Sequence, residues 1–153
     1  MASLEDVLHQ IGEAFADAPR PPDAELLHES CADDNDIASL YGIPHWREVP
    51  DAVVEQEYAA LFFLSPAGFR HFLPASMSFA LRNRHSAAAA VGSTVYALTP
   101  GEGNLRAFSV SKFDLFDEAQ RAAVVAFLEA MVGSEDVTQA LEHWRAGLGL
   151  PSA

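Results

Sequence analysis

The chain of 153 residues contains one cysteine, one lysine and no long apolar run. Because Cys31 is the only cysteine, an intramolecular disulfide framework and a cysteine-rich zinc site are excluded. Apolar stretches such as Tyr58–Leu64 and Ala87–Val91 are far shorter than the ~20 residues that cross a bilayer. The first residues have neither the basic nor the apolar region of a signal peptide. We therefore expect a cytoplasmic protein that does not enter a membrane.

Motifs of the common enzyme classes are also missing. The six histidines include no His-Glu-x-x-His pair, and Ser65 lacks the Gly-x-Ser-x-Gly surroundings of a nucleophile. His28 and the acids near it do not have the spacing of a calcium-binding loop or of a di-iron bundle. We therefore predict no catalytic residue, no metal ligand and no cofactor. Whether the protein is an enzyme stays open, and a binding protein is favoured.

The negative charge of the chain is unevenly distributed. Of a net charge of −13, a net −12 lies in the first 57 residues, which hold fourteen acidic residues and two arginines. Residues 58–112 carry one acid and five basic residues. An acidic end repels nucleic acid and anionic membranes and attracts basic partners, although acidity also serves solubility alone. The small basic cluster Arg82-Asn-Arg84-His85 is a poor nucleic-acid footprint, so we expect no nucleic-acid partner.

Several helix starts are marked by capping residues. Helix N-termini are indicated by Ser3, by the pair Ser65-Pro66, by the capping box of Asp117 with Gln120, and by Ser134 before the last helix. We expect Pro74 to interrupt the helix that begins after Ser65. The predicted helices cover about 4–17, 23–31, 33–41, a segment from 51, 66–84, 117–132 and 135–145.

Strand signals occur late in the chain. Thr94–Leu98 alternates in polarity, Pro100–Gly103 is a turn cluster, and Leu105–Val110 follows as a second short strand. Such a hairpin must pack on helices to be stable. We therefore predict a helix-rich α+β fold with a small antiparallel β-hairpin packed on helices. One domain spans residues 1–153, with its core at about 4–145 and a frayed end at 147–153.

Two runs resemble a known family. They are Trp46-Arg-Glu-Val49, and Ala60-Leu-Phe-Phe-Leu-Ser-Pro-Ala-Gly-Phe-Arg-His-Phe-Leu-Pro-Ala75. Together with Leu98-Thr-Pro100 and Phe116–Leu128, they resemble an uncharacterised bacterial family that carries a "domain of unknown function" label. An excess of arginine over lysine in an alanine-rich chain also suggests a bacterial source with GC-rich DNA. The resemblance implies a shared fold and no catalytic residue.

The first functional hypothesis is a protein-interaction module. Acidic side chains of the N-terminal third would accept hydrogen bonds from Lys and Arg side chains of a basic partner, in place of phosphate groups. One such role is the neutralisation of a basic toxin, such as a nuclease, by an immunity-type protein. The residues that would form this acidic surface are Glu25, Glu29, Asp33, Asp34 and Asp36.

The second hypothesis is a small-molecule binder or enzyme with an anion-binding cleft. Arg47 and Arg70 would hold an anionic ligand, Trp46 would stack against it, and His71 lies beside Arg70. In the structural alternative, Trp46 anchors the connector Ile43–Pro50, which is bracketed by prolines, and the two arginines satisfy buried carbonyls or an internal carboxylate such as Glu48. A third possibility is a subunit of a larger assembly, and the oligomeric state stays open.

Overall fold

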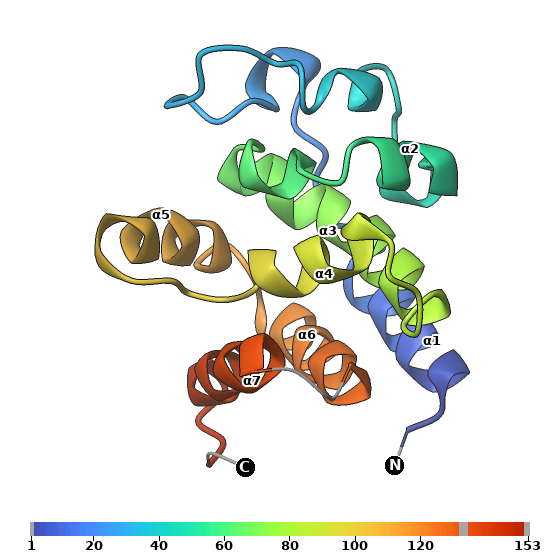
Figure 1. The fold of residues 1–153 in the computed structure, drawn as a ribbon, viewed down its shortest axis with the longest axis vertical. Helices are drawn as coiled ribbons and strands as arrows, with labels where there is room; N and C mark the ends of the chain where they lie inside the picture. Colours follow the sequence, from blue (N-terminus) through green and yellow to red (C-terminus); the bar gives the residue numbers. More distant parts are fainter. Residues whose placement is uncertain (1, 132–134, 152–153) are drawn as a thin grey trace.

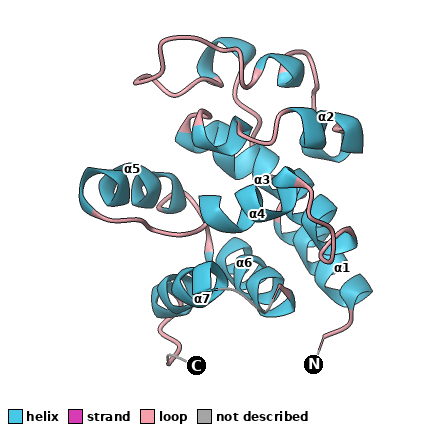
Figure 2. Ribbon diagram, viewed as in Figure 1, coloured by secondary structure: helices cyan, strands magenta, loops and turns pink. Residues whose placement is uncertain are grey.

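The computed structural model describes residues 2–131 and 135–151, and its regular elements are helices (Figures 1 and 2). The α-helices are α1 (Leu4–Ala14), α2 (Asp51–Gln56), α3 (Pro66–Arg82), α4 (Ala89–Ala97), α5 (Gly103–Phe113), α6 (Glu118–Ala130) and α7 (Glu135–Gly147). Short 3₁₀ helices occur at Asp23–Glu25, Ala38–Leu40, Trp46–Glu48 and Ala60–Phe62. Among the described residues, no helix is long and apolar enough to cross a membrane.

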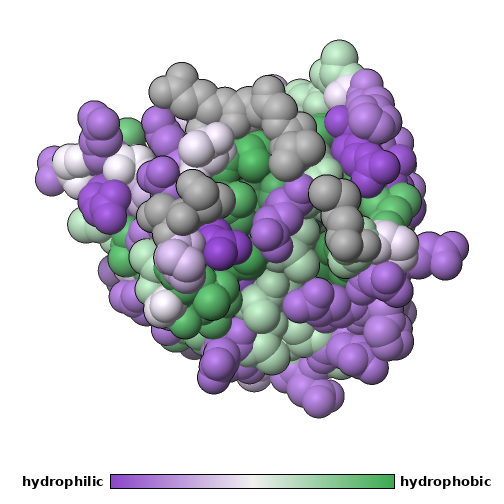
Figure 3. Space-filling model, turned by 90° about the horizontal axis from the view of Figure 1, so that it is seen from below, coloured by the Kyte–Doolittle hydropathy of each residue, from purple (hydrophilic) through white to green (hydrophobic). Residues whose placement is uncertain are grey.

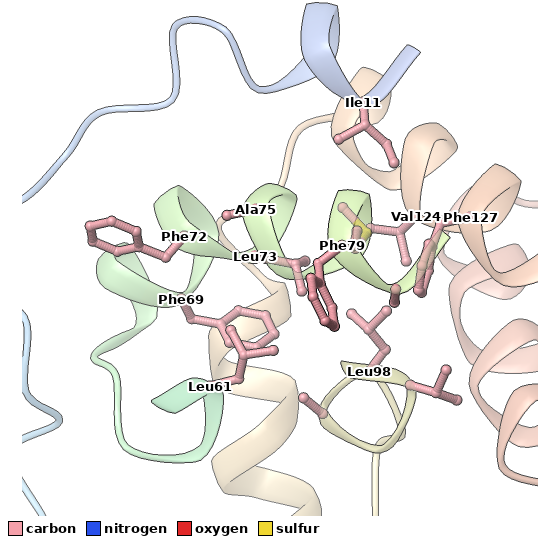
Figure 4. Packing of buried hydrophobic residues seen from close by; sticks show 14 of the residues in the cluster. Ile11, Leu61, Phe69, Phe72, Leu73, Ala75, Phe79, Leu98, Val124 and Phe127 are labelled. Carbon is pink, nitrogen blue, oxygen red and sulfur yellow. The ribbon is translucent and has the colours of Figure 1, made fainter. Parts of the chain in front are cut away.

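Helix α3 lies at the centre of the molecule, where it contacts α1, α2, α4, α5 and α6. Eleven of its 17 residues are buried. Figure 4 shows Phe69, Leu73 and Phe79 of α3 among side chains from the neighbouring helices, including Phe127 of α6. Because burial of each such side chain contributes about 1.5–3 kcal/mol, this helix organises the core.

The C-terminal helices form a second layer around α6, which packs against both α1 and α7. Trp144 of α7 is fully buried, and its indole N–H donates to the carbonyl of Leu98 at 2.9 Å. Its ring contacts Phe113 and Phe116, with centroid distances of 4.7 and 5.3 Å. The lower end of the molecule in Figure 1, where α1, α6 and α7 lie, exposes apolar surface between polar patches (Figure 3).

The predicted β-hairpin is wrong, and the fold is all-α rather than α+β within the described residues. The only β-type pairing there is an isolated antiparallel bridge between Leu27 and Leu64. The two expected strands lie in α4 and α5. The Thr94 hydroxyl donates to the carbonyl of Ala90 at 2.7 Å, a hydrogen bond that a helical backbone permits.

The turn between the two expected strands does exist, but it joins two helices. Gly101 and Gly103 adopt positive φ angles of 73° and 59°. This conformation is strained for other residues, which explains the glycines at the start of α5. A five-residue alternation is too short to separate a strand from a half-buried helix, and burial on one face of α4 selected the helix.

The capping predictions are confirmed for Ser3, Ser65 and Asp117, whose side chains each accept a backbone N–H of the helix that follows. Pro74, however, does not interrupt α3, which continues through it as one helix. The helices expected over 23–31 and 33–41 are only short 3₁₀ turns in an irregular segment. The cap expected at Ser134 lies outside the described residues.

The chain continues in contact with the core beyond α7. Leu148 packs against the core, and the backbone N–H of Leu150 donates to the Arg145 carbonyl at 2.9 Å. The Arg145 side chain in turn donates to the carbonyl of Pro151. Residues 148–151 are therefore tied back to α7.

Candidate functional site

The acidic surface lies on the irregular segment between α1 and α2, at the top of Figure 1. Leu26, Ile37 and Leu40 of this segment are buried and anchor it to the core. We call the five carboxylates between and beside these anchors the acidic face. The four exposed ones are Glu25, Glu29, Asp33 and Asp34, and the half-buried one is Asp36.

The acidic face has no cationic partner within the described part of the chain, because none of its carboxylates forms an ion pair there. Asp33 accepts the backbone N–H of Asn35 at 3.1 Å. Burial raises the pKa of the Tyr41 hydroxyl, and a hydrogen bond to Asp34 adds to this rise. The nearby Arg20 is already paired with Asp23 at 2.7 Å. The negative charge of the face is therefore not neutralised locally.

Contacts with the helical core also fix the position of this segment. The ring of His28 lies 4.5 Å from the ring of Phe108 in α5, and the Ser65 hydroxyl donates to the carbonyl of Glu25 at 2.7 Å. The thiol of Cys31 is directed at the carbonyl of Phe63, at 3.8 Å. The acidic face therefore lies on an irregular backbone that is held at several points.

The connector around Trp46 closes the C-terminal end of α1. The indole N–H of Trp46 donates to the carbonyl of Phe15 at 3.0 Å. The guanidinium of Arg47 donates to the carbonyl of Gly12 at 2.7 Å and lies over the Trp46 ring at 4.7 Å. The ring of His45 lies 3.2 Å from the carbonyl of Ala16. The last carbonyls of a helix have no donor within that helix. The connector supplies a donor to the carbonyl of Gly12 and further donors to the carbonyls of the residues just beyond α1.

His71 joins this connector to α3. Its Nε2 accepts the backbone N–H of Trp46 at 3.0 Å, and its Nδ1 donates to the carbonyl of Ala18 at 2.9 Å. Burial lowers the pKa of His71, and neighbouring His45, Arg20 and Arg70 lower it further, against the hydrogen bond to Ala18, which raises it. The neutral ring satisfies both hydrogen bonds, whereas a protonated ring has no acceptor for the Trp46 N–H.

Of the four residues proposed for an anion-binding cleft, the structure brings Trp46, Arg47 and His71 together at the end of α1. Arg70 instead donates to the carbonyl of Leu115 at 2.9 Å, between α5 and α6. Its Nε is buried and has no acceptor among the described residues. The guanidinium groups of Arg47 and Arg70 thus have separate carbonyl partners.

Lys112, the only lysine, was missed by the sequence reasoning. It is 3 % exposed, and its Nζ donates to the carbonyl of Leu61 at 3.0 Å. The same nitrogen lies 4.4 Å from the centre of the Phe108 ring. Burial lowers the pKa of Lys112 to about 8. The one available signal was its position four residues after Phe108, on the same stripe of a helix.

Metal ligation has no candidate in the part of the chain that the structure describes, which contains no group of three or more His, Cys, Asp or Glu residues placed to hold an ion.

Residues 3–148 match the model of a family described as a family of unknown function, DUF6714. This match confirms the resemblance expected from the sequence. Neither the curated proteins nor the solved structures contain a match.

Proposed function

Because the chain belongs to DUF6714, a family of unknown function, we propose its function from its own residues: it binds a basic protein partner through the acidic face. One observation carries this proposal. Four exposed carboxylates and a half-buried one lie on a single anchored segment, without an ion-pair partner in the described chain.

The physical argument rests on anchoring and on charge. A segment held by Leu26, Ile37 and Leu40 needs little further ordering when a partner binds, which reduces the entropic cost of association. Its carboxylates can accept charge-assisted hydrogen bonds from Lys and Arg side chains. The surrounding negative potential also accelerates the encounter with a basic protein.

A basic toxin such as a nuclease is the partner class that we favour. A nucleic-acid-binding surface is rich in Lys and Arg side chains that fit phosphate groups, and carboxylates can take the place of those phosphates. We place this binding in the cytoplasm, a location compatible with the single free cysteine.

The anion-binding cleft is the weaker proposal. An anion at Arg47 or His71 would have to replace the hydrogen bonds to Gly12, Trp46 and Ala18. Replacement of these bonds would leave buried polar groups without partners, at a cost of about 1–3 kcal/mol each.

The test is affinity capture from a lysate of the source organism with three baits. The first is the wild type, and the second is the variant Glu25→Gln, Glu29→Gln, Asp33→Asn, Asp34→Asn and Asp36→Asn. The third is a control of equal charge change on exposed acids elsewhere: Glu5→Gln, Asp17→Asn, Glu48→Gln, Glu55→Gln and Glu118→Gln.

We expect the wild type and the control to capture the same basic protein, which a salt step releases because salt screens surface charges. The acidic-face variant should lose it. Equal capture by all three baits would reject the acidic face as the binding surface.

A further inference from the structure

One side of helix α5 packs on the core at the C-terminal end of the helix but has no neighbouring element over part of its N-terminal half. Leu105, Phe108 and Lys112 are spaced at i, i+3 and i+7 and share one side of the helix. At the C-terminal end this side is covered, since Lys112 is 3 % exposed. At the N-terminal end Leu105 is 67 % exposed. The side that packs on the core thus extends past the edge of the core.

A groove of about 690 Å³ lies beside this exposed end, between the N-terminal half of α5, the α4–α5 turn and one face of α7. Its apolar lining includes Leu105 and Tyr96, the latter 55 % exposed. Figure 1 shows α5 at the edge of the molecule, with the α4–α5 turn beside it. The groove is open to solvent, so it suits a segment of another chain better than an enclosed small ligand.

The charge around this groove is mainly negative. Glu102, Asp136 and Glu142 line it and are exposed, against one cation, Arg106. None of these four side chains forms an ion pair within the described part of the chain. His143 also lines the groove, and burial lowers its pKa, so it adds no charge at neutral pH. An occupant that complements the groove is therefore apolar on one side and positively charged at its edges.

We propose that the groove between α5 and α7 binds an amphipathic basic helix of a partner protein. Leu105 and Tyr96 contact its apolar side, and Glu102, Asp136 and Glu142 pair with its Lys or Arg residues. A helix matches this arrangement because its apolar side chains repeat at i, i+3, i+4 and i+7 along one face. This surface is separate from the acidic face and does not depend on it.

The test uses a fluorescent 14-residue peptide of leucine and lysine, patterned as an amphipathic helix, as the probe. Fluorescence anisotropy measures its dissociation constant at physiological salt for the wild type and for the groove variant Tyr96→Ser with Leu105→Ser. The matched control is Tyr58→Ser with Leu150→Ser, which removes exposed apolar side chains outside the groove lining. Circular dichroism and thermal unfolding verify that both variants fold.

We expect the groove variant to bind the probe about tenfold more weakly, the loss typical of a central apolar contact, and the control to bind within about twofold of the wild type. The variant Glu102→Gln, Asp136→Asn and Glu142→Gln should also bind more weakly. The acidic-face variant should retain most of the affinity, which separates the two surfaces.

Three results would overturn the proposal. They are equal binding by the wild type and the groove variant, equal weakening in the groove and control variants, or binding that only the acidic-face variant loses. The last result would leave the proposed function intact. A dimer of the wild type that Leu105→Ser abolishes in sedimentation would assign the groove to a second copy of the chain instead.

Discussion

The two halves of the molecule differ in how far side-chain hydrogen bonds to the backbone supplement the packing of apolar side chains. Around α1 and the Trp46 connector, side chains donate hydrogen bonds to backbone carbonyls, as Arg47, Trp46 and His71 do to Gly12, Phe15 and Ala18. Around α6 and α7, large apolar side chains such as Phe127 and Trp144 fill the interior. Hydrogen bonds of the first kind fix an irregular backbone that packing alone does not specify. The segment of the acidic face is held by further bonds of this kind, from Ser65 to the carbonyl of Glu25 and from Arg20 to the carbonyls of Leu40 and Ile43, in addition to its apolar anchors.

The largest effect should come from the apolar half. Trp144→Ala removes a fully buried ring and leaves the carbonyl of Leu98 without its donor, so we expect a loss of about 3–5 kcal/mol in the free energy of unfolding. Chemical denaturation measures it. Tyr58→Ala, at a side chain that is 50 % exposed, is the control and should change stability by less than about 0.5 kcal/mol. Similar losses for the two variants would contradict the assigned core.

His71→Phe tests the hydrogen-bonded half. It leaves the Trp46 N–H and the Ala18 carbonyl buried without partners, so we expect a loss of about 2–4 kcal/mol. Hydrogen exchange should accelerate at residues 12–18 and 43–49 and much less in α6. Uniform acceleration over the chain would show that the two halves unfold together.

The same residue predicts a loss of stability in acid. Burial lowers the pKa of His71 below its ordinary value of 6.5, so the unfolded chain binds its proton more tightly than the folded chain. Stability from this group is complete above pH 6.5 and is lost as the pH falls through the lower, folded pKa. Denaturation of the wild type and of His71→Phe across pH 4–8 measures the contribution. If the stabilities of the two proteins change in parallel with pH, His71 makes no such contribution.

Lys112→Met should stabilise the protein at pH 7, by about 1–2 kcal/mol. The pKa of Lys112 falls from 10.5 to about 8 in the folded chain, so folding with a charged amine costs about 3 kcal/mol, partly offset by its bond to Leu61. Since the unfolded chain binds this proton more tightly, the wild type should gain stability between pH 8 and 10.5. Lys112→Met should lack this gain, and a gain that persists in the variant would arise elsewhere.

The smallest effect on stability should come from the acidic face itself. Replacement of its five carboxylates by amides removes mutual repulsion and breaks no ion pair in the described chain, so we expect a change between zero and about 1 kcal/mol of stabilisation. Thermal unfolding measures this change. A large destabilisation would mean that the carboxylates hold the segment in place.

Much of the helical framework was predictable because its signals are local. Ser3, Ser65 and Asp117 cap their helices through residues three positions later, which a sequence displays directly. The irregular segment was not predictable, because Leu27 pairs with Leu64 and the Arg20 side chain donates to the carbonyl of Ile43. These partners lie far away in the sequence, and no local pattern reveals them.

In the candidate sites, too, features with local signals were predictable and features that depend on distant partners were not. The exposure of the acidic face could be predicted from the count of charges, because carboxylates without a cationic partner stay on the surface. The positions of Arg47 and Lys112 depend on backbone carbonyls 35 and 51 residues away. The error in α4 and α5 has a different cause, because Thr94–Leu98 alternates over too few residues to distinguish a strand from a buried helix.

Hydrogen exchange of the complex with the captured basic protein shows whether the acidic face is the binding surface. We expect binding to slow exchange at residues 23–43, which carry the acidic face and its anchors, and to leave exchange in α6 unchanged. If exchange at residues 23–43 is unchanged and protection is confined to other elements, the partner binds elsewhere and the acidic face is not the binding surface.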